Sequence, residues 1–323
     1  MTKLRTLLMA VVAVFVVSGV SAQTTAADVL KKFNEATELI QQSKFNEAIA
    51  NFEIVLQKGA SMTDAQVVQA VTEARKKMPV ILVARGKQLA GQKKFEEAIG
   101  VFKMAQKRAQ LNSDMRYTAE AKKFIVACYK FQGNDLLNAG KSAEAIEMYK
   151  QGAAIDKNNT ELRLLIARSF GAMNNYAEAS NILKEVIALE KRHDRYRKDA
   201  QAAKLMFNNF MLKGATKSVE ANKYADAIKY LDEILSVDAK EPKAHLMKVQ
   251  IANNMKKFND VIKFGPVAAN ALTDPAEKSS VNFFMGSAYG EMKNYEKAIE
   301  CFKKVTAGEY VKLAKDQIAE LSK

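Results

Sequence analysis

Apolar and polar residues recur along most of the chain with the three-to-four-residue spacing of amphipathic helices. Seven segments share a tighter pattern, beginning with "FNEAIANFEIVL" at Phe45 and ending with "YEKAIECFKKVT" at Tyr295. In most copies a small residue precedes an aliphatic one, and a large apolar residue follows four positions after the small one. These positions share one face of a helix. The small positions, here called the anchors, are Ala48, Ala98, Ala145, Ala179, Ala227, Val261 (the largest of the seven) and Ala298.

A second helix is predicted before each of these seven helices. The clearest signals are Gly86, Gly133 and Gly286, each of which precedes the anchor of its own copy by the same interval. A residue with almost no side chain lets two helices approach closely, and a bulky residue on the facing helix fills the space beside it. The sequence therefore predicts seven helix hairpins held together by small residues packed against large ones.

The anchors are unevenly spaced, at successive intervals of 50, 47, 34, 48, 34 and 37 positions. The three longest intervals exceed the two shortest by 16, 13 and 14 positions. The added segments lie at about 61–78, 112–125 and 191–207. Apolar stripes from Val67 to Met78 and from Tyr117 to Cys128 predict lengthened or additional helices there. At the end of the first of them, we expect Pro79 to start a new helix, because proline fits the first turn of a helix and disrupts its interior.

Two further signals concern the C-terminal third. Gly265 and Pro266 fall inside the expected second helix of the sixth copy, which should end early or kink there. Asp274 and Pro275 have the residue types of a helix cap and a first helical position, so they predict a helix start. After the last copy, residues 309–323 form an amphipathic pattern that we expect to cover the end of the stack.

The pattern resembles the tetratricopeptide repeat, a helix-turn-helix unit of about 34 residues. In the last copy Gly286, Tyr289, Ala298 and Phe302 match the family pattern at its spacing, and the second copy matches almost as well. The chain departs from the family in having no Trp and few closing prolines. The resemblance implies an all-α fold, an α-solenoid of about seven hairpins, some with lengthened or extra helices, and a C-terminal capping helix. The expected repeat cores are 29–60, 79–111, 126–159, 160–190, 208–241, 242–272 and 279–308.

The tripeptide Gly140-Lys141-Ser142 raises the question of a phosphate-binding loop. That loop needs a second glycine five residues before the first of these, between a strand and a helix. Asp135 stands there instead, with helical patterns on both sides. Gly140 is therefore interpreted as a helix-ending glycine in a left-handed turn.

The N-terminus has the pattern of a secretory signal peptide at residues 1–22. Lys3 and Arg5 precede an apolar run, and small residues lead to Ala22. The alternative is an uncleaved anchor helix, but the run of about 11 residues is shorter than the ~20 that span a bilayer. We expect an exported protein of the periplasm, with an extracellular or outer-membrane-associated location as the alternative, and no transmembrane segment in the mature chain.

The chain is basic, with 50 Lys and Arg against 36 Asp and Glu and a net charge of +14. Removing the signal leaves 48 against 36, a net charge of +12. Outside the cytoplasm this charge favours acidic proteins or anionic lipid headgroups as partners over nucleic acid. A lysine-rich, solvated surface is the alternative interpretation. The densest basic patch consists of Lys191, Arg192, Arg195, Arg197 and Lys198.

No catalytic or cofactor chemistry is predicted. His193 and His245 are the only histidines, and neither belongs to a zinc-binding motif. Cys128 and Cys301 both lie in apolar helical patterns, which predicts core packing rather than a disulfide. We therefore expect no enzyme, no metal and no cofactor.

The family resemblance implies a partner-binding groove on the first helix of each hairpin. Carried over to the second, third and fourth copies, the groove positions are Val83, Lys87, Lys130, Asn134, Leu164 and Arg168. The clamp with which some family members hold a C-terminal carboxylate is incomplete, because Leu165 stands where its second Asn would be. The expected function is an envelope scaffold that binds an acidic or amphipathic segment of another envelope or secreted protein. The alternative is a basic adaptor with peripheral contact to anionic membrane or other polyanionic surfaces.

Overall fold

The computed structural model describes residues 24–323, so the predicted signal peptide lies outside the described residues. Within that range the chain forms fifteen α-helices and two short 3₁₀ helices, with no strand. It divides into two compact units, the first ending at Cys128 and the second beginning at Tyr129, inside helix α5 (Met115–Asn138). Each unit is a row of helix hairpins, which confirms the predicted all-α repeat.

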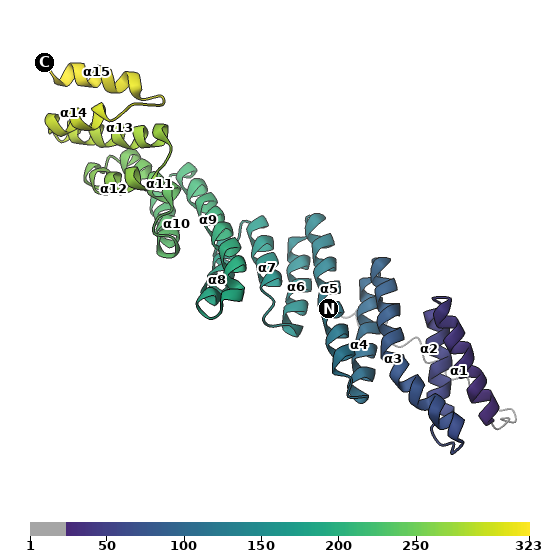
Figure 1. Ribbon diagram of the computed structural model, residues 1–323. Coiled ribbons are helices and arrows are strands. Elements are labelled where there is room, and N and C mark those ends of the chain that lie inside the picture. The colour runs from purple at the N-terminus through teal and green to yellow at the C-terminus, as the bar shows by residue number, and fades with distance from the viewer. Residues whose placement is uncertain (1–23) are drawn as a thin grey trace. The chain divides into compact units, whose positions relative to one another are not determined.

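The first unit begins with two hairpins and ends in the first half of α5. Its other helices are α1 (Ala26–Gln41), α2 (Phe45–Lys58), α3 (Ala65–Gly91) and α4 (Phe95–Leu111). Helix α1 packs on α2, α2 on α3 and α3 on α4, and α1 also contacts α3. Figure 1 shows these helices as neighbours.

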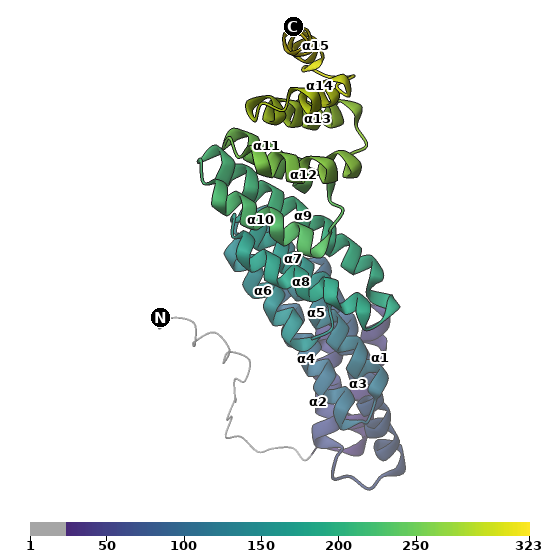
Figure 2. The ribbon, with the colours of Figure 1, turned by 90° about the vertical axis from the view of Figure 1, so that its left-hand side faces the viewer.

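The second unit continues with four complete hairpins and a final helix. Its elements are α6 (Ser142–Ile155), α7 (Thr160–Ala172), α8 (Tyr176–Ala188), the 3₁₀ helices η1 (Leu189–Lys191) and η2 (Asp194–Tyr196), α9 (Arg197–Glu220), α10 (Tyr224–Val237), α11 (Pro242–Asn254), α12 (Phe258–Ala271), α13 (Pro275–Glu291), α14 (Tyr295–Lys303) and α15 (Val311–Leu321). From α6 onward each helix packs on the next, and the first helices α7, α9, α11 and α13 also contact one another in turn. Figure 2 shows α11 to α15 as successive layers.

All seven anchors are fully buried, each with 0% of its surface exposed. The predicted contact of small with large residues also exists. A Cβ atom added to Gly86, Gly133 or Gly286 would lie 3.0 Å or less from atoms of the ring of Phe102, Tyr149 or Phe302, respectively. These rings sit directly on the glycine backbones, so the small residues set how closely the two helices of a hairpin approach.

The three long anchor intervals lengthen first helices. Helices α3, α5 and α9 have 27, 24 and 24 residues, whereas α7 and α11 have 13 each. The stripe from Val67 to Met78 is buried, as predicted. The third added segment differs in part, because η1 and η2 precede α9.

The expectation that Pro79 starts a helix is wrong, because Pro79 lies inside α3. A proline lacks an N–H, so the carbonyl four residues earlier loses its helical donor. That carbonyl belongs to Arg75, and the Asn112 side-chain amide donates to it at 2.6 Å. A side chain from the turn after α4 thus replaces the missing hydrogen bond, and the helix continues.

This replacement yields a first testable prediction. Asn112→Ala should cost about 1 kcal/mol of unfolding free energy, because the Arg75 carbonyl loses its donor. In a Pro79→Ala background the restored N–H serves that carbonyl, so the same substitution should cost much less. A double-mutant cycle by urea unfolding gives the coupling energy directly. Equal costs in both backgrounds would contradict the explanation.

A second proline, Pro266, also lies inside a helix. The second helix of the sixth hairpin does not end early at Gly265 and Pro266, as one of the two alternatives predicted, because α12 continues to Ala271. Its last turn is held by Ala268 and Leu272, which are 0% and 2% exposed, so packing outweighs the one hydrogen bond that proline removes. The predicted start of the following helix is confirmed, because Asp274 accepts from two backbone N–H groups of α13.

A left-handed residue ends the first helix of every hairpin. Gly140 has φ +76°, and its own N–H and that of Lys141 donate to carbonyls of α5. The equivalent residues, with φ between 53° and 60°, are Ser43, Lys93, Asn174, Asn222, Lys256 and Lys293. The turn therefore recurs in all seven hairpins, and the Gly-Lys-Ser segment is the repeat turn rather than a phosphate loop.

Both cysteines are free and buried, as predicted. Burial raises the pKa of the Cys128 thiol to about 11. Burial also raises the pKa of Cys301. A thiol with a raised pKa is less readily ionised, so both side chains act as core groups.

Candidate functional site

The predicted groove residues of the first unit have different environments. Val83 is 2% exposed and belongs to the core, so it does not offer its side chain to a ligand. Lys87 is exposed, but its ammonium lies 2.9 Å from Glu120 and 4.5 Å from the centre of the Phe124 ring. Of these two residues only Lys87 is accessible, and its ammonium already forms an ion pair with Glu120.

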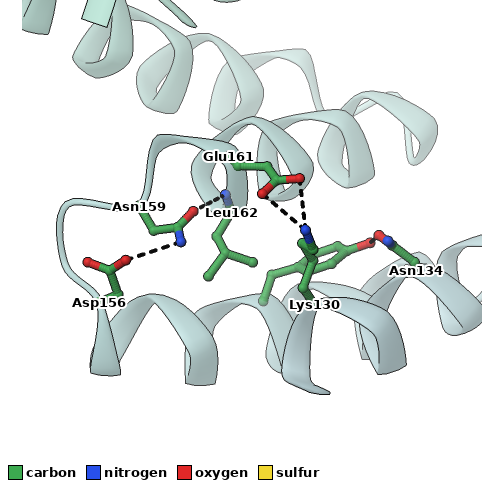
Figure 3. A network of polar contacts seen from close by, with 7 residues as sticks. Lys130, Asn134, Asp156, Asn159, Glu161 and Leu162 are labelled. Carbon is green, nitrogen blue, oxygen red and sulfur yellow. Dashed lines mark hydrogen bonds and ion pairs between the residues drawn. The ribbon is translucent and has the colours of Figure 1, made fainter. Parts of the chain in front are cut away.

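In the second unit, Lys130 and Asn134 are also engaged within the protein. The Lys130 ammonium lies 3.1 Å from Glu161 at the start of α7. Figure 3 shows the two side chains directed toward each other. Asn134 accepts a hydrogen bond from the Tyr149 hydroxyl at 2.7 Å. Burial raises the pKa of the Tyr149 phenol, so it remains a donor at neutral pH. Lys130 therefore links α5 to α7, and Asn134 links α5 to α6.

The predicted positions on α7 differ from each other. Leu164 is half-buried and packs against the core of the fourth and fifth hairpins. Arg168 is exposed, and its guanidinium has no ion pair among residues 24–323. Of the three predicted groove cations, Arg168 is therefore the one that the described chain leaves unpaired.

A groove lies further along the second unit. The predicted groove positions precede the anchors by fixed offsets, as Lys130 and Asn134 precede Ala145. The same offsets give Leu212 and Thr216 in the fifth copy, and Leu246 and Gln250 in the sixth. All four line a groove of about 830 Å³ on α9 and α11, bordered by the end of α7. These four residues were not among the predicted groove positions, which covered only the second to fourth copies, although the same offsets locate them.

The groove combines an apolar floor with charged rims. Leu212, Leu246 and Met247 are half-buried and leave part of their apolar surface accessible. Lys213 and Lys243 line the same groove, and neither side-chain ammonium forms an ion pair or hydrogen bond within the described part of the chain. The rims also carry Glu220 and Glu277. Unpaired charges beside apolar surface are suited to a chain segment that supplies both kinds of contact.

One lysine of the groove is held in place. The Lys217 ammonium donates to Asn174 Oδ1 at 2.7 Å and lies 5.7 Å from the centre of the Tyr176 ring. The Tyr176 hydroxyl donates to the same Asn174 oxygen at 2.9 Å. Asn174 is the left-handed residue of the α7–α8 turn. The repeat turn thus fixes a cation at the groove edge, which reduces the entropy lost on binding.

The predicted basic patch contains internal ion pairs. Arg197 lies 2.8 Å from Asp194 and 3.8 Å from Glu190, and Arg195 lies over the Tyr196 ring at 4.6 Å. The remaining cations of the patch are Lys191, Arg192 and Lys198. These three are exposed on η1, the following turn and the start of α9. Acidic neighbours therefore lower the net charge of the patch below its count of cations.

The histidines have structural contacts. His193 Nδ1 accepts from the Arg195 N–H at the start of η2, and His245 Nε2 lies 2.9 Å from the Ala239 carbonyl oxygen. Across residues 24–323 no group of three or more His, Cys, Asp and Glu side chains could hold a metal ion. None of the helices described is long and apolar enough to cross a membrane.

Comparison with known families gives two matches in sequence. Residues 136–204 and residues 279–307 each match a model of the tetratricopeptide repeat. The first match covers the end of the third hairpin, the fourth hairpin and the start of α9. The second covers the last hairpin. No curated protein matches the chain.

Solved structures with similarity include several proteins with the same repeat. The C-terminal part of a TPR repeat-containing protein from Cytophaga hutchinsonii is 16% identical, covers 88% of this chain and 99% of its own, and has a TM-score of 0.39. The TPR2AB domain of yeast Sti1, in a complex with pHSP90, is 13% identical over 93% of this chain and 100% of its own, with a TM-score of 0.33. YrrB, described as a TPR protein with an unusual peptide-binding site, is 16% identical over 55% of this chain and 83% of its own, with a TM-score of 0.32.

Proposed function

Because this chain is a tetratricopeptide repeat protein, we propose that it is a non-enzymatic interaction scaffold that binds a segment of another protein in the groove on α9 and α11. The N-terminal sequence supports a place in the cell envelope, with the periplasm as the working compartment. The partner is then another envelope or secreted protein.

The observation that carries this proposal is the unpaired charge beside exposed apolar surface in the groove. Side chains of a folded protein that have no partner group are usually surrounded by water, and a ligand can replace that water with charge-assisted hydrogen bonds. Lys213 and Lys243 come from two successive first helices and line the groove together with Leu246. A partner segment with an acidic residue next to apolar ones would satisfy both features together.

The predicted cations Lys87 and Lys130 have a smaller part in this proposal. Each forms an ion pair with a carboxylate from another first helix, and such exposed pairs contribute roughly 0–1 kcal/mol. An acidic ligand could exchange with Glu120 or Glu161 at small cost, but it would gain little. The unpaired lysines of α9 and α11 offer more binding free energy per contact.

The proposal is tested by reversing the charge of the groove. Lys213→Glu with Lys243→Glu should weaken partner capture by at least tenfold, because attraction to an acidic segment becomes repulsion. The measurement is quantitative crosslinking in intact cells followed by identification of the captured protein. Lys150→Glu with Lys229→Glu is the matched control, since both lysines are more than half exposed on second helices of the same unit. Equal capture by wild type and the groove variant would refute the groove assignment.

A further inference from the structure

The turn between α4 and α5 exposes two large apolar side chains, one on each side of it. Leu111, the last residue of α4, is 71% exposed, and Met115, the first residue of α5, is 77% exposed. Of the large apolar side chains in the described chain, these are the two most exposed. Burial in the fold does not account for either of them. We call Leu111 and Met115 the apolar tip.

The apolar tip sits on a firmly held turn. Ser113 has φ +54°, and the Asp114 N–H donates to the Ala109 carbonyl at 2.8 Å. The Asp114 carboxylate accepts from the Tyr117 N–H at 3.0 Å and so caps α5. The Asn112 amide binds the Arg75 carbonyl of α3 at 2.6 Å. Because every residue of the turn is fixed by a hydrogen bond or a defined backbone conformation, the exposure belongs to the folded structure and is not a frayed helix end.

Three cations stand close to the apolar tip in the chain or on a segment that contacts its turn. Lys107 precedes Leu111 by one helical turn, Arg116 follows Met115, and the Arg75 carbonyl is bound by Asn112. Arg75, Lys107 and Arg116 are all exposed, and within residues 24–323 none of them forms an ion pair. The Arg116 guanidinium lies 5.5 Å from the centre of the Tyr117 ring, which leaves its N–H donors available. The acid within the turn is Asp114, whose carboxylate is directed to the helix N-terminus. The surroundings of the apolar tip are therefore positive.

We propose that the apolar tip is a contact site for an anionic phospholipid surface, with Leu111 and Met115 in the headgroup region and Arg75, Lys107 and Arg116 on lipid phosphates. Burying apolar side chains in the interface and attracting anionic headgroups are the two terms of peripheral membrane binding. Long basic side chains can lie along an apolar surface while their charged ends reach the phosphates. A deformable bilayer accepts a protruding pair of this kind without needing a matching cavity.

Two comparisons favour this site and this ligand. The basic patch at Lys191–Lys198 has cations but no large apolar side chain that is comparably exposed, so it lacks the contribution from apolar burial. Leu205 is 68% exposed, but its neighbour Lys204 is paired with Asp238 at 3.0 Å. The α4–α5 turn alone, among the described residues, joins two highly exposed apolar side chains to several unpaired cations. It lies in the first unit and is independent of the groove proposed above.

The test is flotation of the purified protein with vesicles of phosphatidylcholine alone or with phosphatidylglycerol added. Wild type should bind the anionic vesicles and not the neutral ones. Leu111→Ser with Met115→Ser should lower the partition coefficient by about tenfold or more, because apolar burial is lost. Arg75→Gln, Lys107→Gln and Arg116→Gln together should lower it by roughly a hundredfold, at about fivefold for each charge. All forms carry the same N-terminus, so its contribution cancels in these ratios.

Leu205→Ser is the matched control and should leave the partition unchanged. Because every substituted side chain is exposed, each variant is expected to fold, and circular dichroism checks this. Binding that survives both sets of substitutions and disappears when Lys191, Arg192 and Lys198 are changed would overturn the inference in favour of the basic patch. Absence of vesicle binding by wild type would overturn it as well, as would a protein partner whose crosslinking depends on the apolar tip.

Discussion

Gly86→Ala is expected to lower the unfolding free energy of the first unit by about 3 kcal/mol, through overpacking of a tight core. A Cβ atom at this position would lie 2.5 Å from Phe102 Cε1 and 2.7 Å from two further ring atoms. Phe102 is fully buried and stacked on Phe124 at 5.2 Å between ring centres, so a shift of its ring would disturb packed neighbours. The gain in helix propensity from alanine, about 1 kcal/mol, is too small to offset this. Urea unfolding followed by circular dichroism measures the loss.

A second glycine of the same unit provides the control. Gly100 lies inside α4, and a Cβ atom added there would meet nothing within 4 Å. Gly100→Ala should therefore stabilise the protein by about 0.5–1 kcal/mol. Phe102→Leu in the Gly86→Ala background should recover part of the loss, because the smaller side chain vacates the contact. If Gly86→Ala and Gly100→Ala change stability in the same direction, helix approach is not limited by the glycine.

The repeat architecture was readable from the sequence because its determinants are local. An anchor and the bulky residue four positions later lie on the same helix, and the glycine of the first helix stands at a fixed distance before them. The short turn between the two helices leaves few ways to pair them. A burial of 0% at every anchor, Val261 included, shows that the pattern specifies the interior of each hairpin.

The interior prolines show where this local reasoning stops. Pro79 disrupts a helix only if the Arg75 carbonyl stays without a donor, and the donor comes from Asn112, 37 residues away from Arg75. Nothing in the sequence around Pro79 reports that contact. Similarly, α12 passes Pro266 because packing of its last turn outweighs one hydrogen bond. Both outcomes depend on tertiary contacts, which periodicity does not contain.

The candidate site was likewise predictable from the sequence only in part. The spacing from the anchors correctly placed residues on first helices and, applied to the fifth and sixth copies, locates the groove of Leu212 and Leu246. Whether a lysine on such a helix is available depends on its neighbour in the next hairpin. Lys130 meets Glu161, whereas Lys213 meets no acid of the described chain within ion-pair distance. The relative positions of side chains on successive hairpins decide this, and they follow from packing between repeats.

Ala314→Asp is expected to detach α15 from the end of the second unit. Ala314 is 1% exposed and packs in a cluster with Ala298 and Phe302. An unpaired carboxylate in this apolar site would cost several kcal/mol. This cost exceeds the free energy that a single helix of 11 residues gains from its packing. Release of α15 would uncover Phe283, whose ring is stacked on Tyr310 at 4.5 Å. The variant should therefore bind a hydrophobic dye and aggregate, while the groove on α9 and α11 remains folded.

Hydrogen exchange resolves this prediction by segment. Amides of α15 and α14 should lose protection in Ala314→Asp, whereas those of α9 and α11 should keep it, because helices of a repeat array depend mainly on their neighbours. Ala319→Asp is the matched control, since it makes the same chemical change on the exposed face of the same helix and should leave protection unchanged. Equal protection of α15 in both variants would show that Ala314 does not hold the helix. Loss of protection throughout the second unit would instead mean that its hairpins unfold as one cooperative block, with the final helix securing all of them.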